Sequence, residues 1–167
     1  MMGSLTTIGM LQILLILALV YLAYIDLRTF RLPDAITIPM MTAGLLFNYF
    51  PNLGLTSFSN ALTGAILGYT SLWGLNIMYR WVKKQHGIGM GDAKLLAALG
   101  AWFGASALPE LLFIASIGGL VGGLIWLRFQ KQSIRTAFPF GPFLAIAGII
   151  ELLWPQILQT YIQSPLI

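Results

Sequence analysis

All nine Lys and Arg residues of this chain fall in three short segments, which are separated by long apolar runs. The basic residues lie within residues 28–31, 80–94 and 128–135. Of the 167 residues, 58% are hydrophobic and only 8% are charged, whereas a soluble domain has about 25% charged residues. So apolar a chain cannot bury its hydrophobic residues in a water-soluble core, and the sequence therefore predicts a membrane protein.

Six apolar stretches are long enough, or nearly long enough, to cross a bilayer as helices of about 17–25 residues. They are residues 5–24, 35–50, 61–79, 93–108, 111–127 and 143–158. The second stretch contains Pro39 and is therefore expected to be tilted or kinked. We predict an all-α, polytopic membrane helix bundle of about six transmembrane helices, forming a single membrane-embedded domain over residues 1–167.

The basic segments follow the first, third and fifth apolar stretches, whereas the other loops and both termini carry no Lys or Arg. Loops rich in Lys and Arg stay in the cytoplasm. This pattern predicts that both termini are extracytoplasmic. It also places Asp26, Asp34 and Asp92 at the cytoplasmic face.

Small residues recur four positions apart within the predicted helices, and such pairs let helix backbones approach closely in lipid. The pairs are Gly64 with Gly68, Ala97 with Ala101, Gly118 with Gly122, and Gly119 with Gly123. With six helices available, packing inside one bundle is favoured over a dimer interface. The oligomeric state stays open.

Asp26 and Asp92 lie at the predicted cytoplasmic ends of helices, where a carboxylate is costly unless it is paired or solvated. Position alone leaves two alternatives open: a helix N-cap for Asp92, and an interfacial ion pair with Arg28 or with a neighbouring loop for Asp26. Gly89 and Gly91 beside Asp92 favour a functional role, because glycine permits a tight turn or a close approach of a second chain.

Elimination narrows the chemistry that this chain can perform. The chain has no cysteine and one histidine, His86, which is expected to be a solvated loop residue. It has no H-E-x-x-H motif, so no metal and no cofactor are predicted. Its net charge of +4 sits in loops and forms no basic face, so no nucleic-acid partner is expected. A carboxylate pair that shares a proton remains, and such a pair can activate water against a peptide carbonyl.

Three motifs in order closely resemble those of the type IV prepilin peptidases, which are membrane aspartyl proteases of the G-x-G-D type. The motifs are Ile25-Asp26-Leu27-Arg28 continuing to Leu32-Pro33-Asp34-Ala35-Ile36-Thr37, then Gly89-Met90-Gly91-Asp92-Ala93-Lys94, then Pro139-Phe140-Gly141-Pro142. The resemblance runs from about residue 15 to residue 154.

This resemblance implies that Asp26 and Asp92 are the catalytic pair of an aspartic-type endopeptidase. It implies removal of the short basic leader of type IV prepilins or pseudopilins, after a glycine, at the cytoplasmic face of the bacterial inner membrane. The expected partners are these substrates and the lipid bilayer. Residues expected to position the substrate are Gly89, Gly91, Lys94, Pro139, Gly141 and Pro142.

In the segment from Pro139 to Pro142, prolines and a glycine leave backbone polar groups without helical partners close to the membrane. Such groups are tolerated only where they are buried in protein or line a water-filled cavity. The segment is therefore expected to border the active site, although a simple helix start with Pro142 in the first turn is an equal alternative. Longer family members carry an N-terminal extension with two C-x-x-C pairs, tied to methylation. The absence of cysteine implies a peptidase-only form, although a shortened chain would look the same.

Two further expectations concern the aspartates. Asp34 is expected to cap the second helix. Asp26 is expected to hold the shared proton and Asp92 to be ionised, because Asp92 lies at a helix N-terminus with Lys94 nearby in sequence. The competing function is a small transporter or proton-conducting bundle with buried carboxylates, which would place them near the middle of the membrane.

Overall fold

The computed structural model describes residues 2–50, 53–83, 89–130 and 139–155. These residues form helices and contain no β-strand. The helices are α1 (Met2–Thr29), α2 (Asp34–Tyr49), α3 (Phe58–Lys83), α4 (Met90–Phe103), the 3₁₀ turn η1 (Ala105–Ala107), α5 (Leu108–Gln130) and α6 (Gly141–Leu153). The predicted all-α class is thus confirmed.

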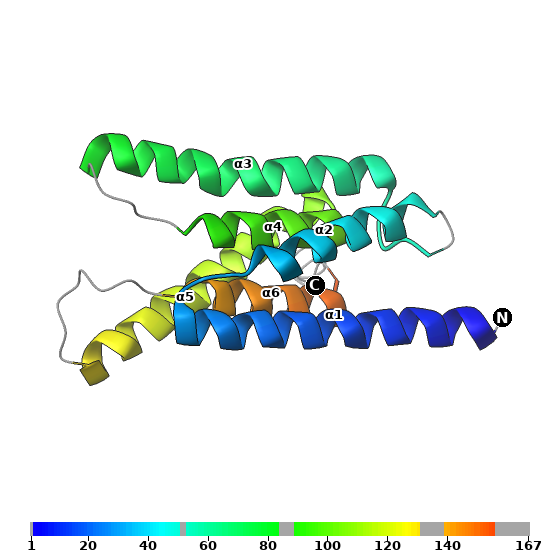
Figure 1. Ribbon diagram of the computed structural model, residues 1–167, viewed down its shortest axis with the longest axis horizontal. Coiled ribbons are helices and arrows are strands. Elements are labelled where there is room, and N and C mark those ends of the chain that lie inside the picture. The colour runs from blue at the N-terminus through cyan, green and yellow to red at the C-terminus, as the bar shows by residue number, and fades with distance from the viewer. Residues whose placement is uncertain (1, 51–52, 84–88, 131–138, 156–167) are drawn as a thin grey trace, which may run out of the picture.

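The α-helices run back and forth along the long axis of the bundle (Figure 1). As a result, the ends of α1, α3 and α5 lie at the same end of the bundle as the starts of α2, α4 and α6. These helix ends flank the three basic segments of the sequence. All three aspartates therefore lie toward one end of the molecule.

Two stretches, Gly9–Thr29 and Ala105–Ile125, are helical, long and apolar enough to cross a membrane, and Gly141–Leu153 is a shorter apolar helix. The predicted fourth span, residues 93–108, is wrong in its extent. The helix ends at Phe103 because Gly104 takes a φ of +88°, a conformation that favours glycine. Asn60 on α3 stabilises the turn that follows, since its Oδ1 accepts a hydrogen bond from the Ala105 N–H at 3.2 Å.

Helix α4 forms the centre of the core, with ten of its fourteen residues buried. Its backbone touches that of α3 at Gly64 and Gly100. A Cβ atom on Gly68 would lie 2.7 Å from the Leu96 carbonyl oxygen, and one on Gly118 would lie 3.0 Å from the Phe143 ring. The predicted role of small residues in packing inside the bundle is confirmed at these positions.

Buried polar side chains hold the middle and the end of α2 against α4. The Asn48 amide donates to the carbonyl oxygens of Ala101 and Trp102 at 2.8 and 3.0 Å. The Trp102 indole N–H donates to the Met40 carbonyl oxygen at 2.9 Å. Buried polar groups need such partners because an unsatisfied one costs about 1–3 kcal/mol.

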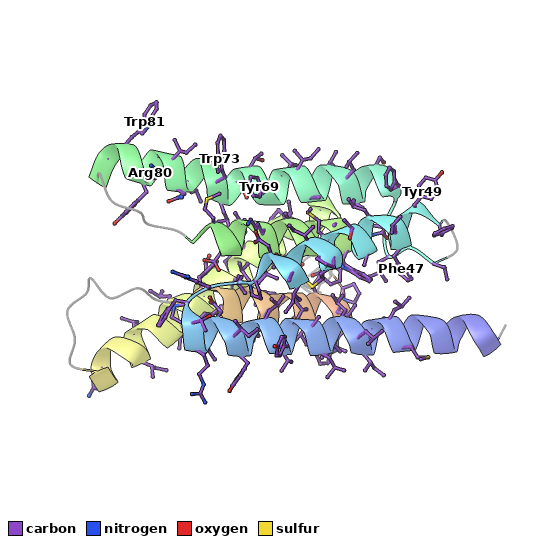
Figure 2. The ribbon with its side chains drawn as sticks, in the orientation of Figure 1. Phe47, Tyr49, Tyr69, Trp73, Arg80 and Trp81 are labelled. Carbon is purple, nitrogen blue, oxygen red and sulfur yellow. The ribbon has the colours of Figure 1, made fainter. Side chains whose placement is uncertain are left out.

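The outer surface of the bundle is apolar. Large hydrophobic side chains such as Leu14, Leu46 and Leu120 are each at least 60% exposed. Trp73 and Trp81 point away from the bundle on α3 (Figure 2). Soluble monomers rarely expose continuous apolar surface beyond a few hundred Å², so this surface suits contact with lipid.

Candidate active site

Asp26 lies in the last turn of α1 and is only 4% exposed. Its Oδ2 accepts a hydrogen bond from the backbone N–H of Gly141, the first residue of α6, at 3.1 Å. A free backbone N–H at a helix N-terminus is well suited to hold a carboxylate. The packing of α6 along α1 therefore positions Asp26 from a residue 115 positions away in the chain.

Gly141 has to be glycine for this contact to form. A Cβ atom at this position would lie 2.7 Å from Asp26 Oδ2 and 3.3 Å from Leu32 Cδ1. Real Cβ atoms essentially never approach another atom within 3.0 Å. Both alternatives offered by the sequence for this segment hold: Pro142 lies in the first turn of α6, and the Gly141 N–H contacts Asp26.

Asp92 is the third residue of α4 and is 8% exposed. It does not cap the helix, since Gly89 occupies the N-cap position. Burial and the nearby negative charge of Asp26 raise the pKa of Asp92 to about 7. The two aspartates are therefore close enough to interact electrostatically, although they come from helices α1 and α4.

Both carboxylates border a cavity of about 770 Å³ at this end of the bundle. Gly89, Gly91 and Lys94, which were predicted to position the substrate, also line this cavity. The polar side chains that line it are Asp26, Thr29, Arg31, Asp34, Asp92 and Lys94. Pro139 and Pro142 are buried and do not line the cavity.

The segment between α1 and α2 was not predicted to shape this site, but its backbone does so. Phe30 ends α1 with a φ of +53°, while its N–H still donates to the Asp26 carbonyl oxygen at 2.9 Å. This left-handed conformation costs a non-glycine residue about 1–2 kcal/mol. It turns the chain so that Leu32 packs on Gly91, where a Cβ atom would lie 2.9 Å from Leu32 Cβ. Phenylalanine gives no sequence signal for such a turn.

Asp34 does not cap α2, so this prediction was wrong. Pro33 is the N-cap residue, and no side chain caps this helix. Asp34 instead forms an ion pair with Lys94 of α4, whose Nζ lies 2.6 and 2.7 Å from the two carboxylate oxygens. Proline fixes the entry to the helix, which leaves the Asp34 carboxylate free to reach across to α4.

The expected assignment of the shared proton is not supported by these contacts. The Gly141 N–H stabilises a negative charge on Asp26, whereas Lys94 binds Asp34. The alternative ion pair of Asp26 with Arg28 is also absent from the described residues, and Arg28 lies over the Tyr24 ring at 5.4 Å. Lys94, on which the expected placement of the proton partly rested, therefore contacts Asp34 and not Asp92.

Within the described ranges, no group of three or more His, Asp or Glu side chains is arranged to hold a metal ion. His86 lies outside the described residues. Of the polar side chains that line the cavity, Asp26 and Asp92 are buried.

The fold and the site define a bundle of helices with an apolar outer surface and two interacting carboxylates at one end. The chain belongs to the type IV leader peptidase family, whose model matches residues 13–124. This finding confirms the family that the three motifs predicted. No solved structure matches the chain.

The chain is similar to several proteins named prepilin leader peptidase/N-methyltransferase. It is 42% identical to that of Stutzerimonas stutzeri over 154 residues, which cover 91% of this chain and 52% of the relative. It is 48% identical to that of Aeromonas hydrophila over 144 residues, covering 85% and 48%, respectively. It is 44% identical to that of Dickeya chrysanthemi over 133 residues, covering 80% and 46%. The chain thus spans about half the length of these relatives.

Proposed function

We propose that this chain is an aspartic-type endopeptidase that removes the short basic leader of type IV prepilins or pseudopilins after a glycine. The observation that carries the proposal is the convergence of Asp26 and Asp92, from α1 and α4, on one cavity. Membership of the type IV leader peptidase family and the names of the relatives support the same substrate class.

In the proposed mechanism, ionised Asp26 takes a proton from a water molecule as its oxygen attacks the carbonyl carbon of the scissile peptide. Protonated Asp92 donates its proton to the carbonyl oxygen, giving a neutral tetrahedral intermediate. This intermediate collapses as the C–N bond breaks. The leaving amine takes a proton from Asp26, and Asp92 recovers a proton from the intermediate. Each carboxyl thus returns to its starting state, as expected for a pair that shares one proton.

We further propose that the site faces the cytoplasm from the bacterial inner membrane. This orientation rests on the three Lys- and Arg-rich segments, since Lys and Arg are enriched in cytoplasmic loops. The helix ends that flank them lie at the end of the bundle where the aspartates lie. The apolar outer surface supports a multi-pass arrangement in lipid.

The competing function, a transporter or proton-conducting bundle, fits the structure less well. Such proteins bind their substrate or ion near the middle of the membrane. Here Asp26 is in the last turn of α1 and Asp92 in the first turn of α4. Carboxylates at one end of a bundle suit a substrate that approaches from the membrane surface.

Replacement of either aspartate tests the proposal. Asp26→Asn and Asp92→Asn should each abolish leader cleavage of a prepilin reconstituted with the protein in vesicles, because neither the base nor the acid can be replaced by an amide. Thermal unfolding in detergent should stay close to that of the unaltered protein. A fully folded Asn variant that cleaves at the normal rate would rule out the carboxylate pair.

A further inference from the structure

A second cavity lies beside the carboxylate cavity and opens between α2 and α3. Its volume is about 490 Å³. Ile38 and Met41 of α2 line one side, Leu62 and Ile66 of α3 line the other, and Ala97 of α4 also lines it. Because it follows the helices and is open to the surface, we refer to this cavity as the α2–α3 groove.

The lining of the α2–α3 groove suits contact with an apolar helix. Ala65 and Ala97 contribute only methyl groups to its lining, and small residues let a second helix approach closely in lipid. Ile38, Leu62 and Ile66 are between 41 and 55% exposed at its edge. The groove follows α2 from Thr37 to Leu45, which is about 12 Å of helix or roughly two turns.

Lys94 connects this groove to the site, because the same side chain lines both the α2–α3 groove and the carboxylate cavity. Its ammonium group is held by Asp34, so its charge is compensated where the two cavities meet. A chain lying in the groove can therefore continue past Lys94 to Asp26 and Asp92.

We propose that the α2–α3 groove receives an apolar helix of a membrane-inserted polypeptide, whose adjoining segment enters the carboxylate cavity for cleavage. This inference rests on the proposed peptidase function and adds the route by which the substrate reaches the site. A polypeptide fits better than a lipid chain, because the groove leads to carboxylates that act on a peptide bond. A lipid in the groove would have to place its headgroup within that same cavity.

Adjacent residues on α3 give a matched test by photocrosslinking. Ile66 lines the groove and is 55% exposed, whereas Leu67 is 52% exposed and does not line it. Benzoylphenylalanine would replace each residue in turn, in vesicles of phosphatidylethanolamine and phosphatidylglycerol. The probe is a prepilin leader and cleavage site followed by a helix of about 20 leucine and alanine residues, long enough to span the bilayer.

The proposal expects a probe adduct at position 66 that is several-fold stronger than at position 67. Equal adducts at both positions, lipid adducts alone at position 66, or no probe adduct at either position would each overturn it. This readout does not depend on cleavage. If the unaltered protein cleaves no prepilin, the proposed function fails, while the adduct pattern still decides the fate of the groove.

Kinetics provide a second readout. Ile66→Trp should raise KM for the helix-bearing probe several-fold while leaving cleavage of a water-soluble peptide with the same leader unchanged. Leu67→Trp should alter neither. If Ile66→Trp affects both substrates equally, it acts on the site or on the fold rather than on the groove, and the proposal is wrong.

Discussion

Gly141→Ala tests how the site is assembled. It adds one methyl group beside the hydrogen bond from the Gly141 N–H to Asp26, the only contact of Asp26 with a backbone donor among the described residues. The added Cβ would lie 2.7 Å from Asp26 Oδ2 and 3.0 Å from its Cγ. Ordinary contacts of this kind begin at about 3.4 Å. The carboxylate must therefore move by several tenths of an ångström, and its 3.1 Å hydrogen bond to the Gly141 N–H is expected to break.

The size of the effect follows from the kind of bond that is lost. A hydrogen bond to a charged group contributes about 1.5–3 kcal/mol, and each 1.36 kcal/mol in the barrier changes the rate about tenfold. We therefore expect kcat/KM for prepilin cleavage to fall by about 10- to 100-fold. Because the donor stabilises ionised Asp26, the pH below which activity is lost should also rise.

The assay is leader cleavage at several pH values, with thermal unfolding measured alongside. Gly74→Ala is the matched control, since a Cβ atom at Gly74 meets nothing within 4 Å. It should leave activity unchanged and raise stability slightly, because alanine favours helix over glycine by about 1 kcal/mol. The reasoning is refuted if Gly141→Ala keeps the kcat/KM and the pH profile of the Gly74→Ala control.

Three further predictions concern the same cavity. Because the pKa of Asp92 is raised to about 7, Asp92 keeps its proton below that pH and loses it above. Because deprotonated Asp92 can no longer act as the proposed general acid, kcat/KM should fall about tenfold per pH unit on the alkaline side. A flat profile from pH 6 to 9 would contradict this. Asp34→Asn and Lys94→Met should each destabilise the protein modestly, since partly exposed ion pairs contribute about 0.2–1 kcal/mol. Their effects on unfolding should be less than additive in a double-mutant cycle, and full additivity would argue against the pair. Cleavage should survive EDTA, because the proposed chemistry uses carboxylates alone; loss in EDTA that zinc restores would require a metalloenzyme instead.

The sequence was sufficient to predict the all-α class and the family, and it singled out Asp26 and Asp92, which line the same cavity. Apolar runs that alternate with basic loops predict a helix bundle in lipid. Lipid offers no hydrogen-bond partner to backbone N–H and C=O groups, so these groups must pair within helices or a closed barrel. Elimination of other side chains then left the carboxylates. These inferences need only composition and order along the chain, and the motifs around Asp26 and Asp92 were enough to find the family.

The tertiary structure decided what those residues touch. That Gly141 donates to Asp26, and that Lys94 binds Asp34 rather than neighbouring Asp92, depends on how α6 and α4 pack against α1 and α2. Proximity in sequence suggested the opposite partner for Lys94 and therefore the opposite placement of the proton. A pKa is set by burial and by neighbours in space, and neither can be read from a linear sequence.

The same distinction explains the errors in the helix boundaries. Hydropathy alone extended the fourth span to residue 108, because no charged residue follows Phe103 before Glu110. The helix stops at Gly104 because the turn there is held by Asn60, a residue of another helix. Composition determined that this protein is a bundle of apolar helices, whereas contacts between distant residues determined where α4 ends and which groups each carboxylate contacts.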